Sequence, residues 1–360
     1  MKTLDSILVQ RREIIRSYQT FDLRRASQRI ERQFAFYSAN LHNIVPLLPK
    51  KVYPEIFRQL HANRRLSFLD VEHAPYGHIL NISGWDERWA AGLRHRPAII
   101  CTYHTGSYRL INYLLAKAGV PFSLLVANGA YRQEQQAMQA LYTSLAQQAG
   151  ITLDMELMDA EQPHALIQMA RAAKRGRSLL VYIDGNTGTT VAGEAYRNLL
   201  QIDFGLQHMA VRKGMAALAH RLGLPIHPVL CERAPDKHFR YGHSIAYHHL
   251  PSLLPLPNES QHDFADRATR TLYAQLATFV TRQPEQWEGW LNVHNQLILD
   301  TEPHPAPDLD DLDLWATYRA GNRAYLLHRP SYYTYPVPWK LYRQYWGVCN
   351  VHFFSDIHTP

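Results

Sequence analysis

The stretch AIICTYHTGSYRLINYLL, residues 98–115, decides the fold class. It begins with a short apolar run, which is typical of a buried strand. Tyr108, Ile111 and Leu115 then recur at helical spacing, and Gly119 is a suitable helix stop. A strand followed directly by a helix is half of a crossover unit, so this stretch predicts a parallel sheet.

The same alternation continues through the middle of the chain. Strands are expected at 97–103, 121–127, 151–157, 178–184 and 224–231, and helices at 131–149, 164–175, 208–222 and 262–282. Glycine or proline bounds most of these runs. The pattern predicts an α/β fold with a mostly parallel central sheet flanked by helices.

Composition predicts three regions. Residues 1–90 are expected to form an N-terminal helical region, and residues 91–300 the α/β domain. Beyond a linker rich in proline and aspartate, residues 301–360 form an aromatic C-terminal extension. An aromatic tail is costly to expose, so we expect it to pack on the core, either as cover or as a lid that adds tyrosine and tryptophan to a pocket.

The bulk composition favours a cytoplasmic protein. With 46% hydrophobic residues in 360, the chain can form a sizeable core. No run approaches the roughly 18 to 20 apolar residues of a membrane span, and the N-terminus lacks a signal-peptide pattern. The three cysteines are scattered, which favours buried free thiols in a reducing compartment. Peripheral contact with the inner membrane is compatible with these features.

The net charge of +7 suggests an anionic partner. Part of the excess lies near the N-terminus, where we expect seven arginines to share one helical segment. These are Arg11, Arg12, Arg16, Arg24, Arg25, Arg29 and Arg32. The segment is either a solvated helix packed by its apolar stripe or a face that docks an anion.

Four stretches carry a family resemblance. They are AIICTYHTGSYRLINYLL (98–115), LLVYIDGNTG (179–188), DFGLQHMAVRKGMAALAHRLGLPIHPVL (203–230) and PEQWEGWLNVHNQL (284–297). In this order they resemble the lysophospholipid acyltransferase superfamily, most closely its lipid A biosynthesis (lauroyl/myristoyl) acyltransferase branch. The resemblance implies a glycerolipid acyltransferase-like fold for residues 91–300.

The resemblance also implies a role for His104. In that family a histidine deprotonates the acceptor, which attacks an acyl thioester, and an acidic residue five positions later orients the imidazole. Here position 109 is arginine. Arginine cannot accept a hydrogen bond, and its charge lowers the basicity of a neighbouring imidazole. The family's His-x4-Asp/Glu motif therefore lacks its acid in this chain.

Three interpretations follow from this departure. Asp184, at the end of a neighbouring strand, can replace the missing acid, since both strand ends should open on one crevice. Alternatively, Arg109 binds a substrate carboxylate or phosphate while His104 acts alone on an amine or hydroxylamine. In the third interpretation the site is inactive and the chain only binds a ligand.

Further substrate-binding candidates surround these residues. Tyr103 and Ser107 flank His104, and Asn186 and Thr187 lie in the polar loop DGNTGTT. Backbone N–H groups of that loop could cradle an oxyanion or phosphate, although a plain turn explains it equally well. Arg132 could substitute for a basic residue that the lipid A branch carries late in the next helix.

These observations predict an acyltransferase of specialised metabolism. The expected donor is acyl carrier protein, a coenzyme A thioester or aminoacyl-tRNA, and the acceptor is a small amine, hydroxylamine or hydroxyl compound. The alternative is a non-catalytic acyl-binding or lipid-binding protein with a degenerate site. No cofactor is expected, and no metal, because the histidines lack ligand spacing.

Overall fold

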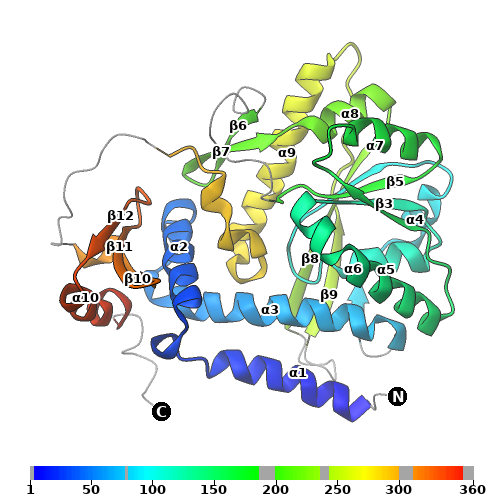
Figure 1. The fold of residues 1–360 in the computed structure, drawn as a ribbon. Helices are drawn as coiled ribbons and strands as arrows, with labels where there is room; N and C mark the ends of the chain where they lie inside the picture. Colours follow the sequence, from blue (N-terminus) through cyan, green and yellow to red (C-terminus); the bar gives the residue numbers. More distant parts are fainter. Residues whose placement is uncertain (1–3, 78–79, 186–198, 236–242, 300–310, 352–360) are drawn as a thin grey trace. The chain divides into compact units, whose positions relative to one another are not determined.

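The computed structural model describes residues 4–77, 80–185, 199–235, 243–299 and 311–351 (Figure 1). The chain divides into two compact units. Unit 1 comprises Met1–Ile14, Ala62–Gly188 and Arg212–Leu276, and unit 2 comprises Ile15–His61, Thr189–Val211 and Ala277–Pro360. Each unit is assembled from segments far apart in the chain. The three regions suggested by composition stay a prediction.

The sheet of unit 1 has seven strands. Their order is β1 (Asn81–Ser83), β9 (His243–His249), β8 (Ile226–Pro235), β2 (Ile99–Thr102), β5 (Ser178–Tyr182), β3 (Phe122–Val126) and β4 (Met155–Asp159). Every neighbouring pair is parallel except β8 and β9. The predicted α/β fold with a mostly parallel sheet is therefore confirmed.

Helices cover both faces of this sheet (Figure 1). One face packs on α4 (Glu87–Leu93), α5 (Leu110–Lys117) and α6 (Asn128–Ala149), and the other on α7 (Ala165–Lys174), α8 (Gly214–Leu222) and α9 (Gln261–Arg282). Successive strand residues point to opposite faces. Ile100 accordingly joins the first core and Ile99 the second, so the continuous apolar runs of the sequence supply two cores at once.

The basic N-terminal segment is not one helix, which corrects the prediction. The helix α1 (Leu4–Gln19) ends before a 3-10 turn at Leu23–Arg25, and α2 (Gln28–Ile44) begins beyond it. Ser27 caps α2, since its side chain accepts a hydrogen bond from the backbone N–H of Ile30. The seven arginines therefore do not share a face, and one of them, Arg11, is only 4% exposed.

The helix predicted at 208–222 is also partly wrong. Its first third belongs to a hairpin of β6 (Leu199–Phe204) and β7 (Gln207–Arg212), and only α8 is helical. Buried and exposed residues alternate along β6, as expected of a half-buried strand. Gly205 turns the hairpin with a φ of 63°, a backbone conformation that favours glycine.

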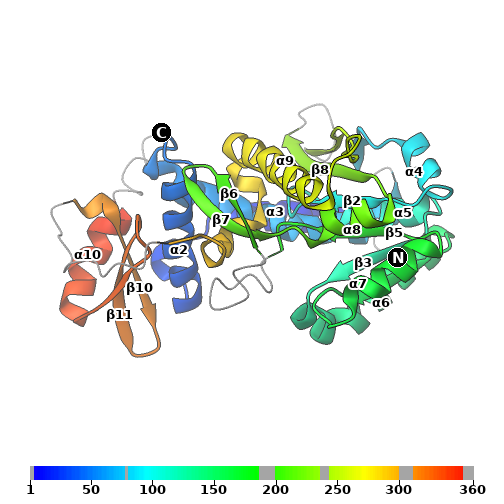
Figure 2. The same ribbon diagram turned by 90° about the horizontal axis from the view of Figure 1, so that it is seen from above.

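The C-terminal extension forms part of unit 2. The strands β10 (Trp315–Ala320), β11 (Arg323–His328) and β12 (Thr334–Val337) make an antiparallel sheet that packs with α2 and α10 (Trp339–Val351), as Figure 2 shows. Arg319 pairs with Glu31 of α2 at 2.6 Å. The extension is thus a structured element, and its role as a cover or lid for the site stays a prediction.

The remaining long helix is α3 (Tyr53–His73). Like the other helices in the described part of the chain, it is not both long and apolar enough to cross a membrane.

Candidate active site

His104 and Asp184 follow two adjacent parallel strands. Thr102 of β2 is paired with Tyr182 of β5, and the N–H of Ile183 donates to the Thr102 carbonyl at 3.1 Å. His104 and Asp184 each lie two positions beyond the paired strand residue. This equal offset brings them side by side at the carboxyl ends of the strands, where α/β folds commonly bind ligands.

The structure hydrogen-bonds the two side chains directly. His104 Nδ1 lies 2.9 Å from Asp184 Oδ1, and the His104 backbone N–H donates to the same carboxylate at 3.0 and 3.2 Å. A carboxylate only accepts hydrogen bonds, so Nδ1 carries the proton and Nε2 keeps its lone pair. The Asp184 side chain is 1% exposed and that of His104 is 28% exposed. The imidazole is thus accessible to solvent, and the buried carboxylate fixes its orientation.

A tight turn fixes the chain directly after His104. Gly106 has a φ of 56°, and a Cβ at this position would lie 2.7 Å from the Cys231 carbonyl oxygen. The turn therefore lies against the backbone of β8 and requires glycine. Two tyrosine rings pack on the imidazole, with centroids 4.8 Å away for Tyr108 and 4.9 Å away for Tyr182. Backbone and side chain of His104 are both constrained.

Arg109 occupies the N-cap position of α5, where a positive charge is disfavoured by the helix dipole. Its guanidinium carbon lies 3.9 Å from the ring centroid of Phe68 and 4.2 Å from that of Tyr108. Stacking on two aromatic faces offsets the unfavourable position. Tyr108 contacts both residues, so the Arg109 guanidinium and the His104 imidazole lie against one tyrosine ring.

Tyr103 and Ser107 are fully buried. The Tyr103 hydroxyl donates to the Leu272 carbonyl at 2.9 Å, and burial raises its pKa well above the usual value. The Ser107 hydroxyl donates to Asp70 at 2.7 Å. Both hydroxyls thus hydrogen-bond within the protein, and the substrate contacts expected of Tyr103 and Ser107 stay predictions.

Three other candidates are not placed by the structure. Asn186 and Thr187 lie outside the described residues, and so does the side chain of Arg132, whose backbone lies in α6. Their substrate-binding roles stay predictions.

Sequence reasoning missed a buried charge cluster behind the turn. Asp70, on α3, binds Arg11 Nη1 at 2.6 Å and also accepts hydrogen bonds from Arg233 and Ser107. Burial by itself raises the pKa of Asp70, but the two arginines and Ser107 together lower it to about 2. The sequence signal was an aspartate set within the apolar run FLDV (68–71) of a helix.

Two further features concern metal ligands and cysteines. Among the residues that the structure describes, no group of three or more histidine, cysteine, aspartate or glutamate side chains could hold a metal ion. Cys101 and Cys231 are buried free thiols, and burial raises the pKa of both. Neither thiol is suited to act as a nucleophile.

Comparison with known proteins finds a distant likeness among solved structures. No family model and no curated protein matches the chain. Among solved structures, it is similar to the 1-acyl-sn-glycerophosphate acyltransferase PlsC from Thermotoga maritima, at 10% identity and a TM-score of 0.34. The match covers 76% of this chain and 97% of that one. A likeness this distant carries no inference about activity.

Proposed function

We propose that this protein is an acyltransferase in which His104, oriented by Asp184, is the general base. The observation that carries the proposal is the 2.9 Å hydrogen bond between a part-exposed imidazole and a buried carboxylate at the carboxyl ends of adjacent strands. A base held by a buried acid is the arrangement that activates weak nucleophiles for acyl transfer. Asp184 supplies the acid that position 109 lacks.

The reaction needs only these two side chains for proton transfer. Nε2 of His104 takes the proton from the acceptor N–H or O–H as the acceptor attacks the thioester carbonyl. The tetrahedral intermediate expels the thiolate, and the imidazolium returns the proton to it. Asp184 remains ionised and stabilises the imidazolium. The products are the acylated acceptor and the free thiol; an aminoacyl-tRNA donor would release a ribose hydroxyl instead.

Arg109 is the proposed anchor for an anionic group of the donor. Coenzyme A, carrier-bound phosphopantetheine and tRNA all carry phosphates, and planar guanidinium donors suit them. Arg132, Asn186 and Thr187 are proposed to add contacts. The acceptor is a small amine, hydroxylamine or hydroxyl compound, and the wider setting is specialised metabolism in the cytoplasm.

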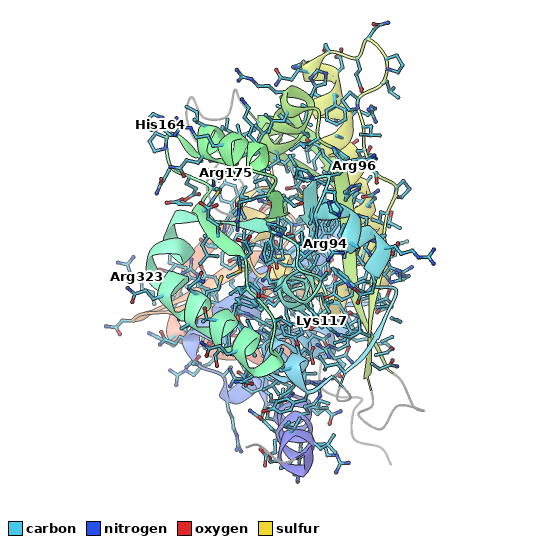
Figure 3. All side chains as sticks on the ribbon, turned by 90° about the vertical axis from the view of Figure 1, so that its right-hand side faces the viewer. Arg94, Arg96, Lys117, His164, Arg175 and Arg323 are labelled. Carbon is cyan, nitrogen blue, oxygen red and sulfur yellow. The ribbon has the colours of Figure 1, made fainter. Side chains whose placement is uncertain are left out.

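Thiol release from octanoyl and palmitoyl coenzyme A tests this function. With hydroxylamine as acceptor, we expect the wild type to release thiol and His104→Gln to lose about 10²- to 10⁴-fold in rate, which is the usual contribution of a general base. The matched control is His95→Gln, since His95 is exposed and precedes β2. Its sequence neighbours Arg94 and Arg96 are labelled in Figure 3. Equal rates for His104→Gln and wild type would exclude His104 as the base.

The non-catalytic alternative gives a different result in the same assay. An acyl-binding protein would bind octanoyl coenzyme A without releasing thiol, with or without hydroxylamine. Wild-type binding in the absence of turnover, including with acylated carrier protein and aminoacyl-tRNA donors, would favour that alternative.

Replacement of Arg109 by alanine should raise KM for octanoyl coenzyme A with little change in kcat. The expected loss is about 1.5 to 3 kcal/mol, roughly 10- to 150-fold, which is typical of a charge-assisted hydrogen bond left unmade. Arg109→Glu should bind still more weakly, because it repels the phosphates. Arg94→Ala, at another exposed arginine of unit 1, is the control.

The glutamate variant distinguishes the two roles considered for position 109. If Arg109 has no role of its own and merely stands where the family has an acid, Arg109→Glu would restore that acid. Acylation of a hydroxyl acceptor would then be faster. A faster glutamate variant would contradict the anchor role.

A further inference from the structure

Asp70 connects four segments of unit 1 that are distant in sequence. It lies within α3 and is completely buried. Its carboxylate accepts hydrogen bonds from Arg11 of α1, Arg233 of β8 and Ser107 of the turn after His104. The side chains of both arginines are 5% exposed or less. A carboxylate with two buried cations and a hydroxyl around it stays ionised and has little freedom to move.

Ser107 is the point at which this cluster meets the candidate active site. It lies three residues after His104, and its carbonyl accepts from the Leu110 N–H at 3.0 Å and from the Tyr247 hydroxyl at 3.4 Å. Ser107 thus joins the glycine turn to α5. Its hydroxyl donates a hydrogen bond to Asp70 at 2.7 Å, which links the start of α5 to α3.

The turn is therefore held at both ends by a buried carboxylate. Asp184 holds the backbone and ring of His104 at one end, and Asp70 holds Ser107 at the other. Gly106, between them, lies against the backbone of β8. Loss of either carboxylate contact would let the turn rotate, and a small displacement of a catalytic base is costly to the reaction.

We propose that Asp70 is a positioning residue for His104. Held by Arg11 and Arg233, it fixes the turn through Ser107 and keeps the imidazole on Asp184. The kinetic consequence rests on the proposed function, whereas the positioning of the ring can be measured without any substrate.

Ser107→Ala tests the proposal because it removes the link and leaves Asp70 paired with both arginines. Nitrogen-15 NMR of ring-labelled histidine reports the tautomer, and comparison with His104→Gln identifies the His104 signals. We expect one Nδ1–H tautomer in the wild type and a mixture in Ser107→Ala. Ser67→Ala is the matched control. Ser67 is fully buried, like Ser107, and lies on α3 near Asp70 in sequence. No hydrogen-bond partner is found for its hydroxyl among the described residues.

The kinetic arm uses octanoyl coenzyme A and hydroxylamine. Ser107→Ala should lower kcat by about 10- to 100-fold with KM unchanged, which is the usual effect of removing a group that orients an active residue. A wild-type tautomer and kcat in Ser107→Ala, or equal changes in Ser67→Ala, would overturn the proposal. If the wild type shows no turnover, the proposed function fails while the tautomer measurement still decides the positioning role.

Discussion

Asp184→Asn is expected to lower kcat by about 10³- to 10⁴-fold while leaving the fold intact, as typically follows when the acid behind a catalytic histidine becomes an amide. The carboxylate now accepts from both His104 N–H groups. An asparagine offers only one acceptor oxygen, so its NH₂ group would face one of the two N–H groups of His104. The imidazole then favours the opposite tautomer, in which Nε2 carries the proton and cannot act as a base.

The double variant makes this prediction specific. If His104 and Asp184 act as one unit, His104→Gln with Asp184→Asn should be no slower than His104→Gln alone. Thiol release from octanoyl coenzyme A measures all three variants. Asp154→Asn is the control, since its side chain is 55% exposed and pairs with Arg177. Multiplied losses in the double variant would show that the two residues act separately.

Local sequence was sufficient to predict five of the seven strands of the central sheet. Apolar runs bounded by glycine or proline coincide with β2, β3, β5 and the first part of β8, and overlap β4 at residues 155–157, because buried parallel strands need apolar residues on both faces. The same reasoning missed β1 and β9, the hairpin of β6 and β7, and the sheet formed by β10–β12. These strands mix polar with apolar residues, which is a weaker signal than a continuous apolar run.

Only those parts of the candidate site that depend on the positions of strand ends were predictable from the sequence. The juxtaposition of His104 and Asp184 follows from two strand ends in one register, which the sequence suggested. The stacking of Arg109 between Phe68 and Tyr108 and the cluster at Asp70 did not follow, because they join α3 to segments 37 or more residues away. Such contacts depend on tertiary packing that no local pattern records.

Asp70→Asn should destabilise unit 1 by about 3 to 5 kcal/mol, the usual result of removing one partner from a buried ion pair. The substitution leaves Arg11 and Arg233 buried without their counter-charge. Hydrogen exchange of backbone amides in β2 and β5 measures this loss in unit 1 itself. A triple variant, Arg11→Met, Asp70→Leu and Arg233→Met, should recover most of the stability, because it removes the charges as well as the pairing.

The pH dependence follows from the lowered pKa of Asp70. Burial opposes ionisation, yet the arginines and Ser107 lower the pKa from 3.8 to about 2. A group with a depressed folded-state pKa stabilises the fold above its unfolded pKa, so this contribution, about 2 kcal/mol, is complete above pH 5. It is lost as the pH falls from about 4 towards 2. Asp70→Asn should lack this part of the acid transition; an unchanged acid transition would show that Asp70 is not ionised in the folded protein.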